Sequence, residues 1–81
     1  MKSYESVIRY LAGEQAQIRQ MYDAKQSNYL AGAYEISEAL GNQLHDMMSA
    51  QKEHVHMVSY IYGVAANTVY RDVNEQAEDN Q

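Results

Sequence analysis

The sequence predicts an all-α fold: a small helical bundle or helical hairpin of three to four helices. Proline, the strongest helix breaker, is absent from all 81 residues. Apolar residues recur at spacings of three, four and seven along most of the chain. Only residues 55–62 have the branched and aromatic composition of a strand. Because no second run is present to pair with it, a strand there would leave backbone groups unsatisfied, and a helix is favoured.

The first helix is expected from Ser3 to about Lys25. Ser3 is a suitable N-cap, and Glu5 lies in the first turn, where the helix dipole favours a carboxylate. Gln15 lies inside the apolar stripe of this helix. It is either half exposed at the edge of a small core or a buried amide that sets register at an interface. The apolar residues of the stripe are Tyr4, Val7, Ile8, Leu11, Ile18, Met21 and Tyr22.

The polar residues 25–28 predict the first turn. A second helix is expected from Tyr29 to Gly41, because glycine after the last apolar residue commonly ends a helix. Asn42 would then cap a third helix with Leu44, Met47 and Met48 on its apolar side. The remaining apolar stripe consists of Val55, Val58, Ile61 or Tyr62, Ala65, Val69 and Val73.

The chain is expected to be a single domain, residues 1–81, with an ordered core of about 3–73. Residues 74–81 are polar or acidic apart from Ala77, and they predict a frayed acidic tail. Small residues cluster at 12–16, 31–33 and 63–66. Since glycine costs about 1 kcal/mol inside a helix, these clusters predict places where two helices approach closely.

Composition excludes several classes of function. Without cysteine, the chain has no disulfide, thiolate zinc site or cysteine nucleophile. A net charge of −5 argues against a surface that binds phosphate backbones, so no direct nucleic-acid partner is expected. No stretch has the length of a membrane span, and the first residues do not resemble a signal peptide. We expect no membrane contact and a location in the cytoplasm, which is the host cytoplasm if the protein is phage-encoded.

No catalytic residue, cofactor or metal site is predicted, and we do not expect an enzyme. His54 and His56 lie two residues apart, about 200° around a helix, so they cannot hold one ion together. Glu35 and Glu38 share a helix face, but a chain of this size is not expected to desolvate a general acid. Neither a nucleophile elbow nor a glycine-rich phosphate loop is present.

A helix-turn-helix-like transcriptional regulator is the alternative function. Residues 36–48 place apolar positions around Gly41 in the manner of that motif. The second helix of the motif, residues 42–51, contains Asp46 and neither lysine nor arginine. Because readers of the major groove depend on those residues, an ordinary helix stop at Gly41 is favoured. A related form that serves only dimerisation stays open.

The aromatic composition is the most unusual feature, with eight tyrosines, five methionines, no phenylalanine and no tryptophan. Tyrosine and methionine are enriched at protein interfaces, although such rings also cover small cores. We expect a small acidic, non-enzymatic protein-binding module. Its specific form would be an inhibitor or modulator of a larger macromolecular machine, such as a host nuclease or polymerase, encoded by a phage or mobile element. The expected partner-binding residues are Tyr10, Gln15, Tyr34, Tyr60 and Tyr70.

Self-association is expected as well. A helix from Ser3 to Lys25 is about 35 Å long, more than shorter helices can cover. We therefore expect a homodimer or a heteromeric complex with a protein partner of unspecified identity. The expected contacts are Val7, Leu11, Ile18 and Tyr22. Whether the acidic surface imitates nucleic acid in a basic groove stays a hypothesis from composition alone.

Overall fold

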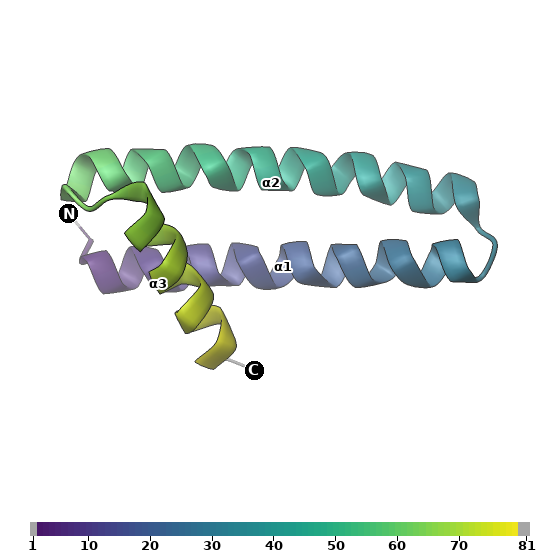
Figure 1. The fold of residues 1–81 in the computed structure, drawn as a ribbon, viewed down its shortest axis with the longest axis horizontal. Helices are drawn as coiled ribbons and strands as arrows, with labels where there is room; N and C mark the ends of the chain where they lie inside the picture. Colours follow the sequence, from purple (N-terminus) through teal and green to yellow (C-terminus); the bar gives the residue numbers. More distant parts are fainter. Residues whose placement is uncertain (1, 80–81) are drawn as a thin grey trace.

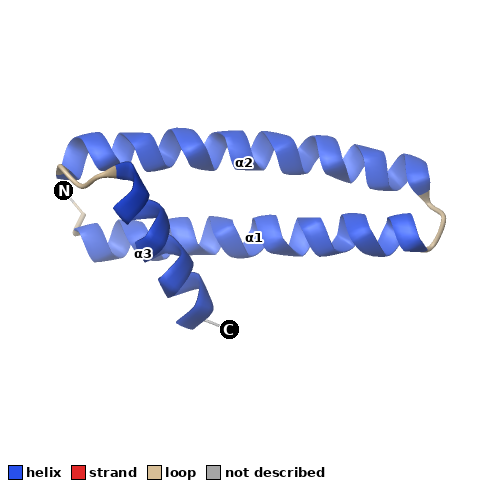
Figure 2. Cartoon of the chain, viewed as in Figure 1, coloured by secondary structure: helices blue, strands red, loops and turns tan. Residues whose placement is uncertain are grey.

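The structure, a computed structural model, describes residues 2–79 and forms three helices in that range (Figure 1). They are α1 (Tyr4–Leu30), α2 (Tyr34–Tyr62) and α3 (Ala66–Asp79). Helices α1 and α2 form an antiparallel hairpin along the long axis of a molecule that measures 45 × 24 × 20 Å. Helix α3 crosses the end of the hairpin where the N-terminus lies. The described residues form only helices and connecting loops, so the all-helical prediction is confirmed, including residues 55–62 (Figure 2).

The first helix begins as predicted but ends later. The Ser3 hydroxyl accepts a hydrogen bond from the Ser6 backbone N–H at 3.2 Å, so Ser3 is the N-cap. The turn predicted at residues 25–28 is wrong, because these residues continue α1. There the Asn28 side-chain amide donates to the Ala24 carbonyl at 2.8 Å, one helical turn earlier. The chain turns instead at residues 31–33, where Gly32 has a φ of 83°.

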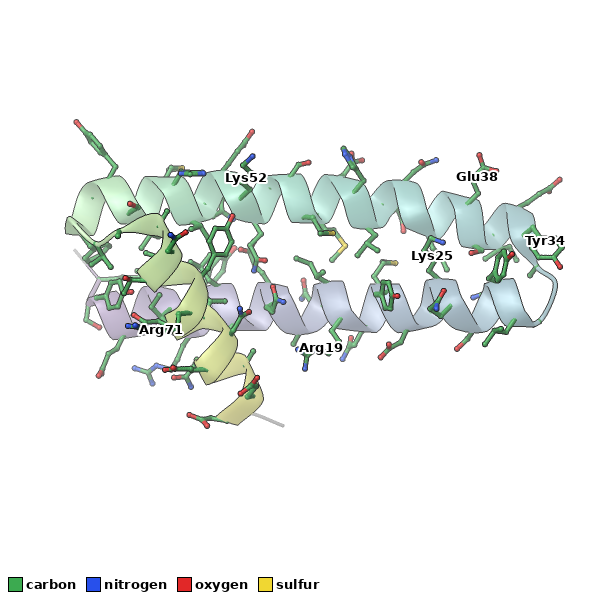
Figure 3. All side chains as sticks on the ribbon, in the orientation of Figure 1. Arg19, Lys25, Tyr34, Glu38, Lys52 and Arg71 are labelled. Atoms are coloured by element: carbon green, nitrogen blue, oxygen red, sulfur yellow. The ribbon has the colours of Figure 1, made fainter. Side chains whose placement is uncertain are left out.

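Gly41 lies inside α2, so the predicted helix stop is wrong. A Cβ atom at this position would lie 2.9 Å from Cε of Lys25, whose side chain extends from α1 toward α2 (Figure 3). One turn earlier, the buried Ser37 hydroxyl donates to the Lys25 carbonyl at 3.0 Å. The glycine therefore leaves room for the end of the Lys25 side chain. The predicted second and third helices are one helix, and the turn required by the helix-turn-helix alternative is not present in residues 36–51.

The end of α2 and the whole of α3 also differ from the prediction. Gly63 adopts a left-handed conformation, with a φ of 66°, and its N–H donates to the Ser59 carbonyl. It therefore ends α2, and the apolar stripe predicted over 55–73 is divided between two helices. Residues 74–79, which were predicted to belong to a frayed tail, continue α3 to Asp79. This last part of the helix is held in place because the Ala77 side chain is buried. Residues 80–81 of that predicted tail lie outside the described residues.

The hydrophobic core lies at the end of the hairpin that α3 covers. Each helix contributes two residues to it: Ile8 and Leu11 from α1, Val55 and Val58 from α2, and Val69 and Val73 from α3. The rest of the hairpin consists of two helices alone. Because two helices cannot enclose one another, much of the apolar surface of this part stays exposed.

The exposed area of the chain reflects this open architecture. The molecule exposes 5785 Å². A folded monomer of 9.3 kDa exposes about 5,000 Å² by the usual scaling of surface with mass. The excess, about 800 Å², is the contribution that one partner makes to a protein interface of standard size.

Candidate interaction surface

The hairpin has one face that α3 does not cover. Ile8 and Val55 pack against the valines of α3 in the core. Tyr10 and Met57 follow them by two residues, which is about 200° around a helix. Their side chains therefore lie on the side of the hairpin turned away from α3. This side is called the far face.

A groove runs between α1 and α2 on the far face, near the end of the hairpin that holds the core. It has a volume of about 360 Å³. Its floor includes Leu11 and Val58, which also belong to the core. Its walls carry three exposed apolar side chains: Tyr10 is 65% exposed, Met57 58% and Ile61 54%. The groove is completed by Lys2, Val7, His54 and Tyr62. Large apolar groups above a buried floor form a typical protein-docking surface.

Polar contacts between the two helices fix the walls of the groove. His54 Nδ1 lies 3.0 Å from a Glu14 carboxylate oxygen at the edge of the groove. One turn away, the buried Gln51 amide donates to the Leu11 carbonyl at 3.1 Å. The buried amide that sets helix register is therefore Gln51 rather than Gln15.

Helix α3 is tied to the start of α1 by Tyr4. The Tyr4 hydroxyl donates to an Asp72 carboxylate oxygen at 2.7 Å, and its ring packs edge-on against Tyr62 with 5.7 Å between ring centroids. Burial, together with the hydrogen bond to the negatively charged Asp72, raises the pKa of Tyr4 to about 12. The phenol therefore stays protonated and keeps α3 in place at neutral pH.

The predicted partner-binding residues do not form one surface. Tyr10 lines the groove on the far face, and Tyr60, beside Ile61 in the sequence, is almost fully exposed. Tyr34 lies near the hairpin turn, where its ring packs edge-on against Tyr29. Gln15 and Tyr70 line a separate hollow of about 380 Å³, to which α3 contributes. Of the five, only Tyr10 contributes to the groove.

Two of the four residues predicted for self-association are already covered by their own chain. Leu11 is 1% exposed and Ile18 9%, so a second chain could cover little of either side chain. Their burial within one chain follows from the length of α2, which is one helix where two shorter ones were expected. Val7 is half-buried and lines the groove, and Tyr22 is exposed. For Val7 and Tyr22, self-association stays a prediction.

Sequence reasoning missed Met57 and assigned Ile61 only as an alternative to Tyr62 in the buried stripe. The signal was a second stripe on α2 with alternating spacings of four and three. It lies one residue before the stripe that faces α1, which runs from Ser37 through Leu44, Gln51 and Val58. The second stripe, called the far stripe, consists of Ile36, Leu40, Gln43, Met47, Ala50, His54, Met57 and Ile61.

The described residues contain neither a cluster typical of a metal site nor a membrane-spanning helix. Within residues 2–79, no group of three or more His, Cys, Asp or Glu side chains is placed to hold an ion. His45 and His56 are exposed, and His45 lies 4.0 Å from its neighbour Asp46. No helix in the same range is both long and apolar enough to cross a bilayer.

A cleft of about 560 Å³ between α1 and α3 is bordered by the carboxylates of Glu5, Asp72, Glu75 and Asp79.

No protein-family model, curated protein or solved structure matches the chain.

Proposed function

We propose that this chain is a non-enzymatic protein-interaction module that binds through the far face of its hairpin. The observation that carries the proposal is the groove, where Tyr10, Met57 and Ile61 are more than half exposed above a buried floor. Exposing such side chains together is unfavourable in water, so covering them with a partner yields binding energy. Tyrosine and methionine are also among the residues enriched at interfaces.

The rigidity of the groove also supports this function. Its walls are two helices of 27 and 29 residues, and their register is fixed by the Gln51 and His54 contacts. Little conformational freedom is lost when a partner binds to walls that are already ordered, so more of the contact energy remains as affinity.

The more specific form of the proposal is an inhibitor or modulator of a larger macromolecular machine, such as a host nuclease or polymerase. Small size and a net charge of −5 support it, because an acidic surface is attracted to proteins that bind nucleic acid. A transcriptional regulator is not favoured, since α2 is continuous through Gly41.

Protein capture tests the general proposal. The tagged chain is used as bait in a bacterial lysate that also contains an untagged copy, and bound proteins are identified. We expect Tyr10→Ser with Met57→Ser to lose the bound protein. Tyr34→Ser with Met48→Ser is the matched control, because it removes the same side chains at exposed positions outside the groove. Equal retention of bound protein by both variants, with helicity intact, contradicts binding through the far face.

A further inference from the structure

We propose that the partner that covers the far face is a second copy of this chain, packed antiparallel so that two hairpins form a four-helix bundle. The inference rests on the proposed function and names the occupant of the same surface. In this arrangement α2 packs along α2 of the second copy, and α1 along its counterpart. The two α3 helices lie on the outer sides of the bundle.

The far stripe has the pattern of a helix that packs against two neighbours. Its spacings of four and three match those of the stripe that faces α1, displaced by one residue or about 100°. Six of its eight residues are apolar. Ile36, Met57 and Ile61 are each more than half exposed, whereas Leu40 and Met47 are half-buried. Helix α2 thus presents a second packing surface for which residues 2–79 supply no further helix.

The order of residues along the far stripe is self-complementary. An antiparallel copy related by a two-fold axis between Met47 and Ala50 places residues equally far from that point opposite one another. Ile36 then lies opposite Ile61, and Leu40 lies opposite Met57. The two polar residues of the stripe, Gln43 and His54, also lie opposite each other. Every apolar position in the far stripe of one copy therefore faces an apolar position of the other copy, and the polar residues face each other. An isologous interface requires this kind of self-complementarity.

The same axis is consistent with α1. Gln51 contacts the Leu11 carbonyl and Ser37 the Lys25 carbonyl, so residues facing across the hairpin have numbers that add to about 62. By this register the axis between Met47 and Ala50 meets α1 between Gly13 and Glu14. Tyr10 and Gln17 lie equally far from that point, so the exposed tyrosine of one copy lies opposite the exposed Gln17 of the other.

The available area is sufficient for a stable dimer. The broad side of the molecule measures 45 × 24 Å. A standard interface covers about 800 Å² per partner, which equals the area that this chain exposes beyond that of a typical monomer of its mass.

Charge within the far stripe does not oppose this pairing. The far stripe has no lysine, arginine, aspartate or glutamate, and its one titratable residue, His54, is paired with Glu14 in the same chain. The net charge of −5 per copy is carried elsewhere. We therefore expect association to persist or strengthen as salt screens the repulsion between two acidic copies.

Sedimentation equilibrium of the full chain tests the inference. The wild-type protein is expected at twice 9.3 kDa at micromolar concentrations. Met57→Glu with Ile61→Glu is expected to remain helical and sediment as a monomer, because both side chains are exposed within one chain. Leu30→Glu with Tyr60→Glu is the control. It introduces the same charge at two more exposed residues outside the far stripe and is expected to remain dimeric.

Each outcome decides between the two proposals. A wild-type mass of 9.3 kDa up to millimolar concentration overturns the homodimer. If that monomer still captures another protein and loses it in Tyr10→Ser with Met57→Ser, the interaction module stands with a different occupant. A dimer that both glutamate variants leave intact overturns the far face as its interface. If the Met57 and Ile61 variant unfolds, Ala50→Arg at the exposed centre of the stripe replaces it, with the same expected mass.

Discussion

Replacing Leu11 by alanine tests whether α1 is held by its own chain. Leu11 is 1% exposed and packs in the core with Val55, Val58, Val69 and Val73, so all three helices contribute to its surroundings. Truncation to alanine removes three buried carbons and leaves a cavity. The expected loss in the free energy of unfolding is about 3 kcal/mol, within the range of buried Leu→Ala changes. A domain of 81 residues has about 4 to 12 kcal/mol in total, so this loss is a large part of it.

The control is the same substitution at Leu30, which is 83% exposed. Since little surface is buried there, Leu30→Ala is expected to change stability by less than about 0.5 kcal/mol. Urea denaturation followed by circular dichroism measures both. With a slope of about 1 to 1.5 kcal/mol per M, the midpoint of Leu11→Ala is expected to fall by about 2 to 3 M.

Protein concentration separates packing within one chain from packing between chains. All variants are measured over a hundredfold range of total concentration, because association makes stability depend on concentration. The deficit of Leu11→Ala relative to wild type is expected to stay constant if its side chain packs only within the monomer. A loss below about 1 kcal/mol, or one that appears only where the wild type is dimeric, would refute the assignment of Leu11 to the monomer core.

Three further predictions concern α1, the end of α2 and the attachment of α3. Gly13→Ala is expected to stabilise the protein by about 1 kcal/mol in thermal or urea unfolding, because the new Cβ has no neighbour within 4 Å and α1 gains helix propensity. A Cβ at Gly63 also meets no neighbour, but Gly63→Ala is expected to lower the free energy of unfolding by about 1 kcal/mol, because alanine is strained at the left-handed φ of 66°. Equal effects of the two substitutions on stability would contradict the backbone conformation at Gly63. Tyr4→Phe is expected to lower stability by about 1 to 2 kcal/mol at pH 7 through loss of the bond to Asp72. The Tyr4 pKa is raised from 10.0 to about 12 in the folded protein, so its contribution is complete below pH 10 and is lost as pH rises through 12. The stability difference between wild type and Tyr4→Phe should therefore shrink over that interval, and a constant difference would argue against the Tyr4–Asp72 bond.

The features that follow from local sequence were predictable. Helical periodicity, the absence of proline and the Ser3 cap gave the all-helical fold and the start of α1. The helix predicted for residues 55–62 is confirmed, and its basis is the lack of a second run of residues that could pair with a strand, which is a property of the whole sequence.

The errors lie where distant residues determine the structure. Gly41 has the local features of a helix stop, but it is placed where the Lys25 side chain crosses from the other helix. Gly63 has the features of a helix crossing, yet it ends α2. Gln51 lies in a polar segment of the sequence and is buried because it reaches the Leu11 carbonyl. None of these three roles can be read from neighbouring residues.

The candidate surface was only partly predictable for the same reason. Tyr10 was predicted as an interface residue from the tyrosine-rich composition of the chain. Met57 and Ile61 could be assigned to the surface only once the length of α2 was known. Once α2 is one helix from Tyr34 to Tyr62, its two stripes follow from the spacing alone. With α2 divided at Gly41, the far stripe is divided as well and its symmetry is lost.

The distance between two spin labels at position 35 tests whether two copies pair antiparallel through their far faces. The chain has no cysteine, so Glu35→Cys gives one labelling site per copy at an exposed position near the hairpin turn. In the antiparallel dimer the two labels lie at opposite ends of the bundle. At 1.5 Å per residue from the axis between Met47 and Ala50, the expected separation is about 40 to 45 Å. A separation below about 20 Å, or no dipolar coupling at concentrations where the unlabelled chain is assayed, would contradict the antiparallel pairing of two far faces.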